Sequence, residues 1–208
     1  MNRKLKWVYN PFEQIAGWEA FGIGLVILCV TTVTGYFGNT VFYGISIKAV
    51  PEVTWGSAFA LQASGLAVMV VVMWITALLS AKRVRFQDIL GTVTLAKYPL
   101  LLAALFFLAF RKRLKEITDM FMAALGELAS ETSRVPAAEL LSELTPFDYA
   151  LFIVLTIISI LILVWTIALL FNAFKVSTNL KGVKCALLFI AIVLISEIII
   201  NVIVSIIY

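Results

Sequence analysis

Two ionisable residues, Lys97 and Glu197, lie inside stretches of the chain that are otherwise long and apolar. An ionisable side chain at bilayer depth costs several kcal/mol, so each of the two is a candidate functional residue. Asn201 follows Glu197 by one helical turn and would share its helix face. Such a set could relay a proton or an ion, or line a polar substrate cavity. Two simpler alternatives are an ion pair that only neutralises itself and a Lys97 side chain that extends to the membrane surface.

Helix lengths favour a contact between these two residues. Lys97 lies 11 residues beyond the start of its apolar stretch at Phe86, which is about 16 Å along a helix. Glu197 lies 15 residues beyond Gly182, which is about 22 Å. If both helices cross the membrane in the same direction, two long side chains can close a difference of about 6 Å. We predict a buried Lys97–Glu197 contact, with Asn201 on the same face.

The composition excludes a water-soluble or a disordered protein. Of the 208 residues 62% are hydrophobic and 13% are charged, whereas an ordinary globular protein is about half apolar and a quarter charged. The chain has no histidine, and its two cysteines, Cys29 and Cys185, lie inside apolar stretches. We therefore expect no metal site, no cofactor, no disulfide and no nucleophile–base pair, and hence no enzyme. The net charge of +4 suits anionic lipid headgroups and gives no reason to expect a nucleic-acid partner.

Five stretches are long and apolar enough to cross a bilayer. They are residues 20–42, 55–80, 86–110, 149–174 and 182–207. The fold class predicted from them is an all-α integral membrane protein, a bundle of five transmembrane helices with a short amphipathic helical loop between the third and the fourth. Residues 1–19 would form an N-terminal interfacial segment, with Trp7, Tyr9, Phe12, Ile15 and Trp18 at headgroup level.

The third stretch allows two interpretations. Its first half is polar and contains Asp88, and its second half contains Lys97 and Pro99. It is either a kinked spanning helix shielded by its neighbours or a half-inserted hairpin that returns to the same side. Five spans divide the Lys and Arg residues nine to six in favour of a cytoplasmic N-terminus, whereas four spans divide them eleven to four. Charge alone therefore favours four spans.

The loop of residues 111–148 has an amphipathic pattern. Apolar residues recur in it at three- and four-residue steps: Leu114, Ile117, Phe121, Leu125 and Leu128. This pattern predicts a helix that either caps the bundle on the membrane surface or offers a docking face to a partner. A second short helix would begin near Ser133 and carry Leu140, Leu141 and Leu144.

Four segments together resemble the Yip family of integral membrane proteins, named for interacting with Ypt/Rab GTPases, and in particular its short bacterial branch. They read VRFQDILG (84–91), LAKYP (95–99), VW (164–165) and FKVSTNLKGVKCA (174–186). In that family a polar loop with Phe and Gln enters a Pro-containing helix, and a later tryptophan-bearing helix ends in a short basic turn before the last span. The resemblance implies five spans and a cytoplasmic N-terminus, and for this reason we prefer five spans to four.

The resemblance also bears on function. Eukaryotic members act in traffic between endoplasmic reticulum and Golgi and carry a long cytosolic N-terminal region. Because only 19 residues precede the first predicted span here, we do not extend Rab binding to this chain. The resemblance implies a protein of the bacterial cytoplasmic (inner) membrane with a non-enzymatic scaffolding or membrane-organising role, whose partners are the lipid bilayer and other membrane proteins.

The alternative function is a small transporter or channel subunit built around Lys97, Glu197 and Asn201. A cavity that reaches Glu197 would favour this alternative. A sealed bundle with an exposed apolar face over residues 114–128 would favour the scaffold.

Overall fold

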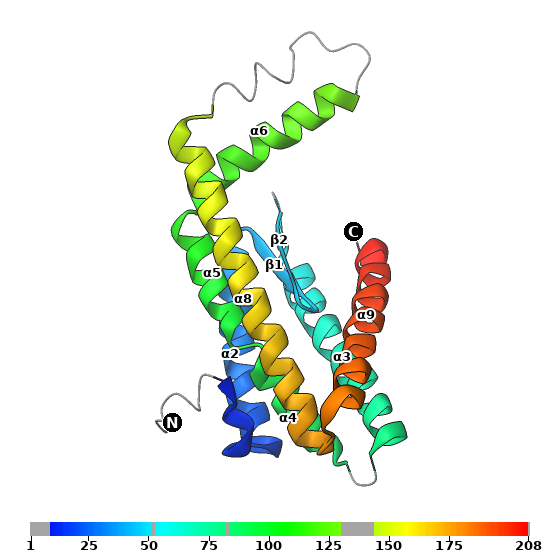
Figure 1. Ribbon diagram of the computed structural model, residues 1–208. Helices are drawn as coiled ribbons and strands as arrows, with labels where there is room; N and C mark the ends of the chain where they lie inside the picture. Colours follow the sequence, from blue (N-terminus) through cyan, green and yellow to red (C-terminus); the bar gives the residue numbers. More distant parts are fainter. Residues whose placement is uncertain (1–8, 51–52, 82–83, 130–143, 208) are drawn as a thin grey trace.

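In the part of the chain that the structure describes, five helices are long and apolar enough to cross a membrane, which confirms the predicted fold class. The computed structural model describes residues 9–50, 53–81, 84–129 and 144–207, without the side chains of 124–129 and 207. The spanning elements are α2 (Gly17–Phe37), α3 (Trp55–Ser80), the pair α4 (Phe86–Ala96) and α5 (Pro99–Ala109), α8 (Pro146–Thr178) and α9 (Gly182–Ile207) (Figure 1). The chain is therefore described here as an integral membrane protein.

The third span is a broken helix that continues in one direction. α4 and α5 follow each other along the long axis of the bundle and together form one apolar segment, Phe86–Ala109 (Figure 1). The break falls at Lys97 and Tyr98, because Pro99 has no N–H to donate to the preceding turn and instead starts α5 as its first residue. Of the two interpretations the kinked spanning helix is confirmed, and the four-span count that charge alone favoured is wrong.

A β-hairpin follows the first span, where the sequence analysis predicted helix up to residue 42. α2 ends at Phe37, Gly38 caps it, and Asn39 has a φ of 52°. The strands β1 (Thr40–Tyr43) and β2 (Ser46–Ala49) then pair antiparallel, with Tyr43 opposite Ser46. A two-residue turn joins them, and its first residue, Gly44, has the positive φ of 57° that such tight turns require. The predicted helix over 38–42 is therefore wrong.

Strand β1 of the hairpin is buried between helices on both of its faces, whereas β2 is half-buried in its first two residues and exposed in its last two. Phe42 packs with Leu100 of α5 and Ile162 of α8, whereas Val41 and Tyr43, pointing the opposite way, pack with residues of α3 and α9. This alternation is the ordinary two-residue period of a strand. Non-helical backbone is tolerated at membrane depth only where protein or a cavity surrounds it, and the hairpin meets this condition. Figure 1 shows it descending between α8 and α9.

The helices form one closed and one open region. In the closed region α4 and α5 pack against α2 on one side and α8 on the other. Gly24 of α2 permits this approach, since a Cβ there would lie 2.6 Å from the backbone nitrogen of Leu95. In the open region α8 and α9 diverge from the turn that joins them, α9 packs mainly on α3, and the hairpin occupies the space between (Figure 1).

The predicted amphipathic helix is present as α6 (Arg111–Ala129). Arg113 anchors it to the start of α8 through a two-pronged ion pair with Asp148, a residue that is 1% exposed. The hydrogen bonds to Asp148, and then to Glu116, raise the pKa of Arg113. Ile117 is buried beside this anchor, against Leu151 and Leu155 of α8. The second short helix predicted near Ser133 lies outside the described residues, apart from Leu144.

The N-terminal segment lies against the end of α8. It contains a short 3-10 helix, η1 (Pro11–Glu13), whose Phe12 is buried, whereas Tyr9 and Trp18 are exposed. The side-chain amide of Asn172 donates a hydrogen bond of 2.8 Å to the backbone oxygen of Tyr9. The start of the described chain and the α8–α9 turn are therefore at the same end of the bundle.

Candidate functional site

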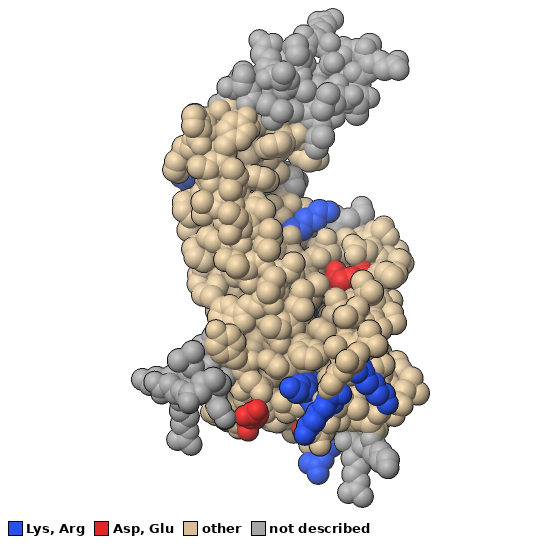
Figure 2. All heavy atoms as spheres, viewed as in Figure 1, with Lys and Arg blue, Asp and Glu red and all other residues tan. Residues whose placement is uncertain are grey.

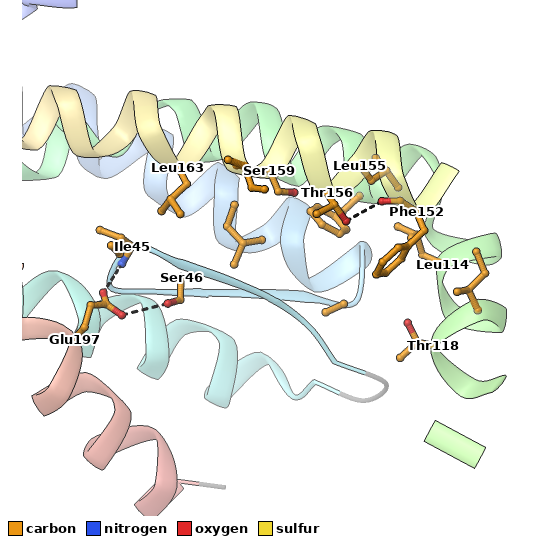
Figure 3. Close-up of a pocket in the computed structure, with 15 residues that line it drawn as sticks. Ile45, Ser46, Leu114, Thr118, Phe152, Leu155, Thr156, Ser159, Leu163 and Glu197 are labelled. Carbon is orange, nitrogen blue, oxygen red and sulfur yellow. Dashed lines mark hydrogen bonds between the residues drawn. The ribbon is translucent and has the colours of Figure 1, made fainter. Parts of the chain in front are cut away.

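Glu197 of α9 binds the tip of the buried hairpin. Its Oε1 accepts a hydrogen bond of 2.9 Å from the backbone N–H of Ile45, and its Oε2 accepts one of 3.1 Å from the hydroxyl of Ser46 (Figure 3). Gly44 makes this contact possible, because a Cβ at that position would overlap the carboxylate. Gly65 of α3 supports the turn from another side, since a Cβ there would overlap the backbone nitrogen of Gly44. One intramembrane carboxylate thus fastens a tight turn against two spanning helices.

Lys97 is near Glu197 but does not touch it. The lysine side chain is completely buried at the α4–α5 break, and its Nζ has no hydrogen-bond partner among the described residues. The two charges are close enough to interact electrostatically, yet they form no ion pair in the described part of the chain. The predicted direct contact is therefore absent. The hairpin tip donates the hydrogen bonds to Glu197 that the prediction assigned to Lys97.

Asn201 lies on the outer side of α9. It is exposed, and its side-chain amide donates a hydrogen bond of 2.8 Å to the backbone oxygen of Glu197, one turn earlier in the same helix. The structure therefore does not bring Asn201 together with Lys97 and the carboxylate of Glu197.

A cavity of about 460 Å³ extends from Glu197 along the inner side of α8. Its walls come from β2, α5, α6 and α8, and most of its lining is apolar, with Phe107 and Leu163 as examples. Figure 3 shows Glu197 and Ser46 at one end of this groove and Leu114 and Thr118 of α6 at the other. Glu197 is the only charged side chain among the described lining residues. We call this cavity the groove.

Few charged side chains surround the groove: Glu197 lines it, and Lys48 of β2 is exposed between two residues of the lining. Figure 2 shows Lys and Arg side chains gathered at the end of the molecule where α8 turns into α9, and one basic and one acidic side chain among uncharged residues in the central part of the same face. The basic residues of that turn are Lys175, Lys181 and Lys184, all of them exposed. The groove runs along α8 from Phe152 to Leu163, within a helix that is long and apolar enough to span a membrane.

The apolar face of α6 contributes to this groove. Leu114 and Ile117 line it, and Ile117 is only 3% exposed because α8 covers it. The ring of Phe121 stacks on that of Phe152 of α8, with 6.1 Å between the centroids. Leu125 and Leu128 lie in the helix, but their side chains are outside the described part. Within the described residues the chain therefore covers much of this predicted partner face itself.

Other buried polar side chains lack partners within the described chain. The side-chain amide of Gln62 on α3 and the hydroxyl of Ser196 on α9 form no hydrogen bond there. Ser64, by contrast, bonds within its own helix. A buried polar group without a partner costs free energy, so α3 and α9 keep these groups at the expense of stability.

Sequence reasoning identified Glu197 and missed its partners. Ile45 and Ser46 were not singled out, because they fall in the connection between the predicted spans 20–42 and 55–80. A signal was present: Gly44 stands between two short runs of β-branched and aromatic residues, which is a hairpin pattern.

Comparison with models of protein families, with curated proteins and with solved structures finds no match for this chain. The resemblance to the Yip family accordingly stays a prediction.

Proposed function

We propose that the protein binds a small lipophilic molecule, taken up from the bilayer, in the groove between the hairpin, α6 and α8. The groove itself carries this proposal. Its volume of about 460 Å³ falls in the range typical of small-molecule sites, about 300 to 1,000 Å³. Such sites combine mainly apolar walls with a few polar groups that orient the ligand, and here Glu197, Ser46 and Ser159 are such groups.

Of the two functions that the sequence left open, this supports the transporter class over the scaffold. The cavity reaches Glu197, which is the feature expected of a transport or binding subunit. We therefore propose a non-enzymatic, membrane-embedded binding protein, either a small transporter or the binding subunit of one.

The location is part of the same proposal. The exposed lysines of the α8–α9 turn lie at the same end as the start of the described chain. Because cytoplasmic loops are enriched in Lys and Arg, this arrangement supports a cytoplasmic N-terminus. The bacterial cytoplasmic membrane is the location that the Yip resemblance implies.

Photolabelling of the protein in lipid nanodiscs tests the function. The probe is decanol with a diazirine at the end of its chain, and mass spectrometry identifies the labelled residues. We expect saturable labelling of residues that line the groove, displaced by an excess of unlabelled decanol. In Leu163→Trp, a large ring placed in the groove should abolish this labelling.

Leu161→Trp is the matched control. Leu161 lies two residues earlier on α8 and is 63% exposed, on the outer surface of the bundle. This variant should be labelled in the groove like the unmodified protein. Labelling that does not saturate, or that Leu163→Trp leaves unchanged, would contradict the proposal.

A scaffolding role of the Yip type is the second candidate. Phe121 and Met122, exposed on α6 by 37% and 57%, support it because the described chain leaves both of these apolar side chains partly uncovered. Its test is isolation from native membranes in mild detergent, with and without Phe121→Ser and Met122→Ser. The scaffolding role would be favoured over the binding role if a stoichiometric partner is isolated with the unmodified protein and is absent from the double variant.

A further inference from the structure

We infer that the molecule bound in the groove is a single-chain amphipathic cation, whose ammonium group pairs with Glu197 and whose chain extends toward Leu114 and Thr118. This inference rests on the proposed function, because it specifies the chemistry of the ligand that the groove takes. Three features of the groove carry it: its charge, the free positions on the carboxylate, and its shape.

The charge among the residues that line the groove has one sign, and Lys48 of β2, exposed on the other face of its strand from the lining residues Ile47 and Ala49, stays outside the lining. Glu197 is the only ionisable side chain among the described residues that line it. Lys97 interacts electrostatically with this carboxylate, but it is sealed in the closed region, 0% exposed, and is not among the described residues of the lining. Lys97 therefore weakens the negative field of Glu197 without being accessible to a ligand. Surrounded by hydrocarbon, this field attracts a cation and repels an anion more strongly than it would in water.

The carboxylate retains capacity for a ligand. An ionised carboxylate offers about four acceptor positions on its two oxygens. The hairpin uses one position on each oxygen, through the N–H of Ile45 and the hydroxyl of Ser46. An ammonium group carries several donors and no acceptor, so it can fill the remaining positions without displacing the turn. A carboxylate or phosphate headgroup offers no donor when ionised and would meet Glu197 as a like charge.

The rest of the groove suits one hydrocarbon chain. From Glu197 the lining continues past Leu163 and Leu155 to Leu114, and the few hydroxyls along it are dispersed (Figure 3). The hydroxyl of Thr156 already donates to the backbone oxygen of Phe152. Along α8 the lining runs from Phe152 to Leu163, about 16 Å of helix, which matches a single extended chain of medium length. A cavity of about 460 Å³ does not hold both chains of a phospholipid together with its headgroup.

Three photoreactive probes with the same chain and different head groups test the inference: decylammonium, decanol and decanoate, each with a diazirine at the chain end, at neutral pH in nanodiscs of zwitterionic lipid. The measured quantity is groove labelling divided by labelling of the lipid-facing residues of α8, such as Leu161, because this ratio corrects for partitioning into the bilayer. We expect decylammonium to exceed decanol by about tenfold, the ratio that one charge-assisted hydrogen bond provides. Decanoate should give the lowest ratio.

The position of the label adds a second readout. With the ammonium at Glu197, the chain end should label Leu114, Thr118 and their neighbours. A label centred on Leu163 and Ile45 would mean that the chain lies the other way round, and would overturn the inference.

Glu197→Gln should reduce the preference for decylammonium to near unity and leave the labelling by decanol in place. Asn201→Leu is the matched control, because Asn201 lies one turn away on the outer side of α9, and it should keep the preference. If Glu197→Gln does not fold, the comparison of the three probes on the unmodified protein still decides the question. Equal labelling by all three probes would overturn the inference and leave the proposed function standing, whereas no groove labelling by any of them would overturn both.

Discussion

The two intramembrane charges of this protein lie in regions built in opposite ways. Lys97 lies in the closed region, where α4 and α5 pack between α2 and α8, and it is fully buried without a hydrogen-bond partner in the described chain. Glu197 lies in the open region, where α8 and α9 diverge, and it accepts two hydrogen bonds and faces a cavity. Lys97 and Glu197 look equivalent in the sequence. Burial of Lys97 lowers the stability of the closed region, whereas Glu197 holds the hairpin in the open region and is accessible from the groove.

This difference shows that bilayer depth alone does not make a residue functional. An ionisable group acts on a ligand only where the backbone around it leaves an opening, and in this chain the hairpin creates that opening. The strands separate α9 from α8 in the half of the bundle where two helices would otherwise close on each other (Figure 1). Substitutions in the closed and in the open region should therefore differ in their effect on stability.

The largest effect is expected from filling the helix contact of the closed region. In Gly24→Val the new Cβ would lie 2.6 Å from the backbone nitrogen of Leu95 and 2.8 Å from the backbone carbon of Thr94. Backbone atoms cannot rotate away as a side chain can, so α2 and α4 must separate. We expect a loss of about 3 kcal/mol or more in the free energy of unfolding, measured by denaturant titration in detergent micelles.

Gly22→Val is the matched control for this variant. Gly22 lies two residues earlier on the same helix, and a Cβ there meets nothing within 4 Å. The control should unfold like the unmodified protein. If the free energy of unfolding fell equally in both variants, the loss would reflect the helix propensity of valine. The closed region would then not depend on the close approach of the α2 and α4 backbones.

The second largest effect should be a gain. Lys97→Met replaces a buried, unpartnered ammonium with an apolar side chain of similar length, and so removes an uncompensated desolvation cost. We expect the free energy of unfolding to rise by about 1 to 3 kcal/mol. Lys97→Gln is the comparison variant, because it keeps a buried polar group and should gain less. A loss of stability in Lys97→Met would mean that the lysine supports the closed region and that the contrast with Glu197 is mistaken.

The sequence predicted the spans far better than the segment between them. Composition and stretch length identified α3 from its first to its last residue, because a hydrocarbon layer imposes the same requirement on every spanning helix. Pro99 likewise indicated the break between α4 and α5. The hairpin was missed because the apolar stretch 20–42 continues through Val41 and Phe42, which are as apolar as the residues of a span. Its burial depends on α3, α5, α8 and α9 lying around it, and a window of local hydropathy contains no information about those contacts.

The candidate site shows the same limit. Glu197 was identified because the type of one residue in one apolar helix is local information. Its partners Ile45 and Ser46 are more than 150 residues away in the chain, and only the packing of hairpin on α9 brings them together. Asn201 was included because of helical periodicity, which gives the face of a helix but not the neighbour that this face meets.

A moderate effect is expected from removing the carboxylate in the open region. Glu197→Ala leaves the N–H of Ile45 and the hydroxyl of Ser46 without their acceptor at membrane depth. We expect the free energy of unfolding to fall by about 1 to 2 kcal/mol. Hydrogen exchange at the amide of Ile45 should also become faster, which a change elsewhere in α9 would not cause. Glu197→Gln keeps one acceptor oxygen and should lose less; equal losses in the two variants would show that the charge, and not the hydrogen bonds, fastens the hairpin.

The smallest effect separates the two faces of α9. In Asn201→Leu an exposed amide that bonds only to its own helix is replaced by an apolar side chain at a position that faces lipid. The change removes a polar side chain from hydrocarbon, which is favourable, and removes its hydrogen bond to the backbone oxygen of Glu197, which is unfavourable. Because that oxygen also takes part in the backbone hydrogen bonding of α9, the two contributions to the free energy of unfolding should nearly cancel. We expect a difference within about 0.5 kcal/mol in the free energy of unfolding, measured in the same micelles as the Glu197 variants. A loss of unfolding free energy as large as that of Glu197→Ala would show that the outer face of α9 also contacts a partner. The contrast between the groove side and the outer side of α9 would then be wrong.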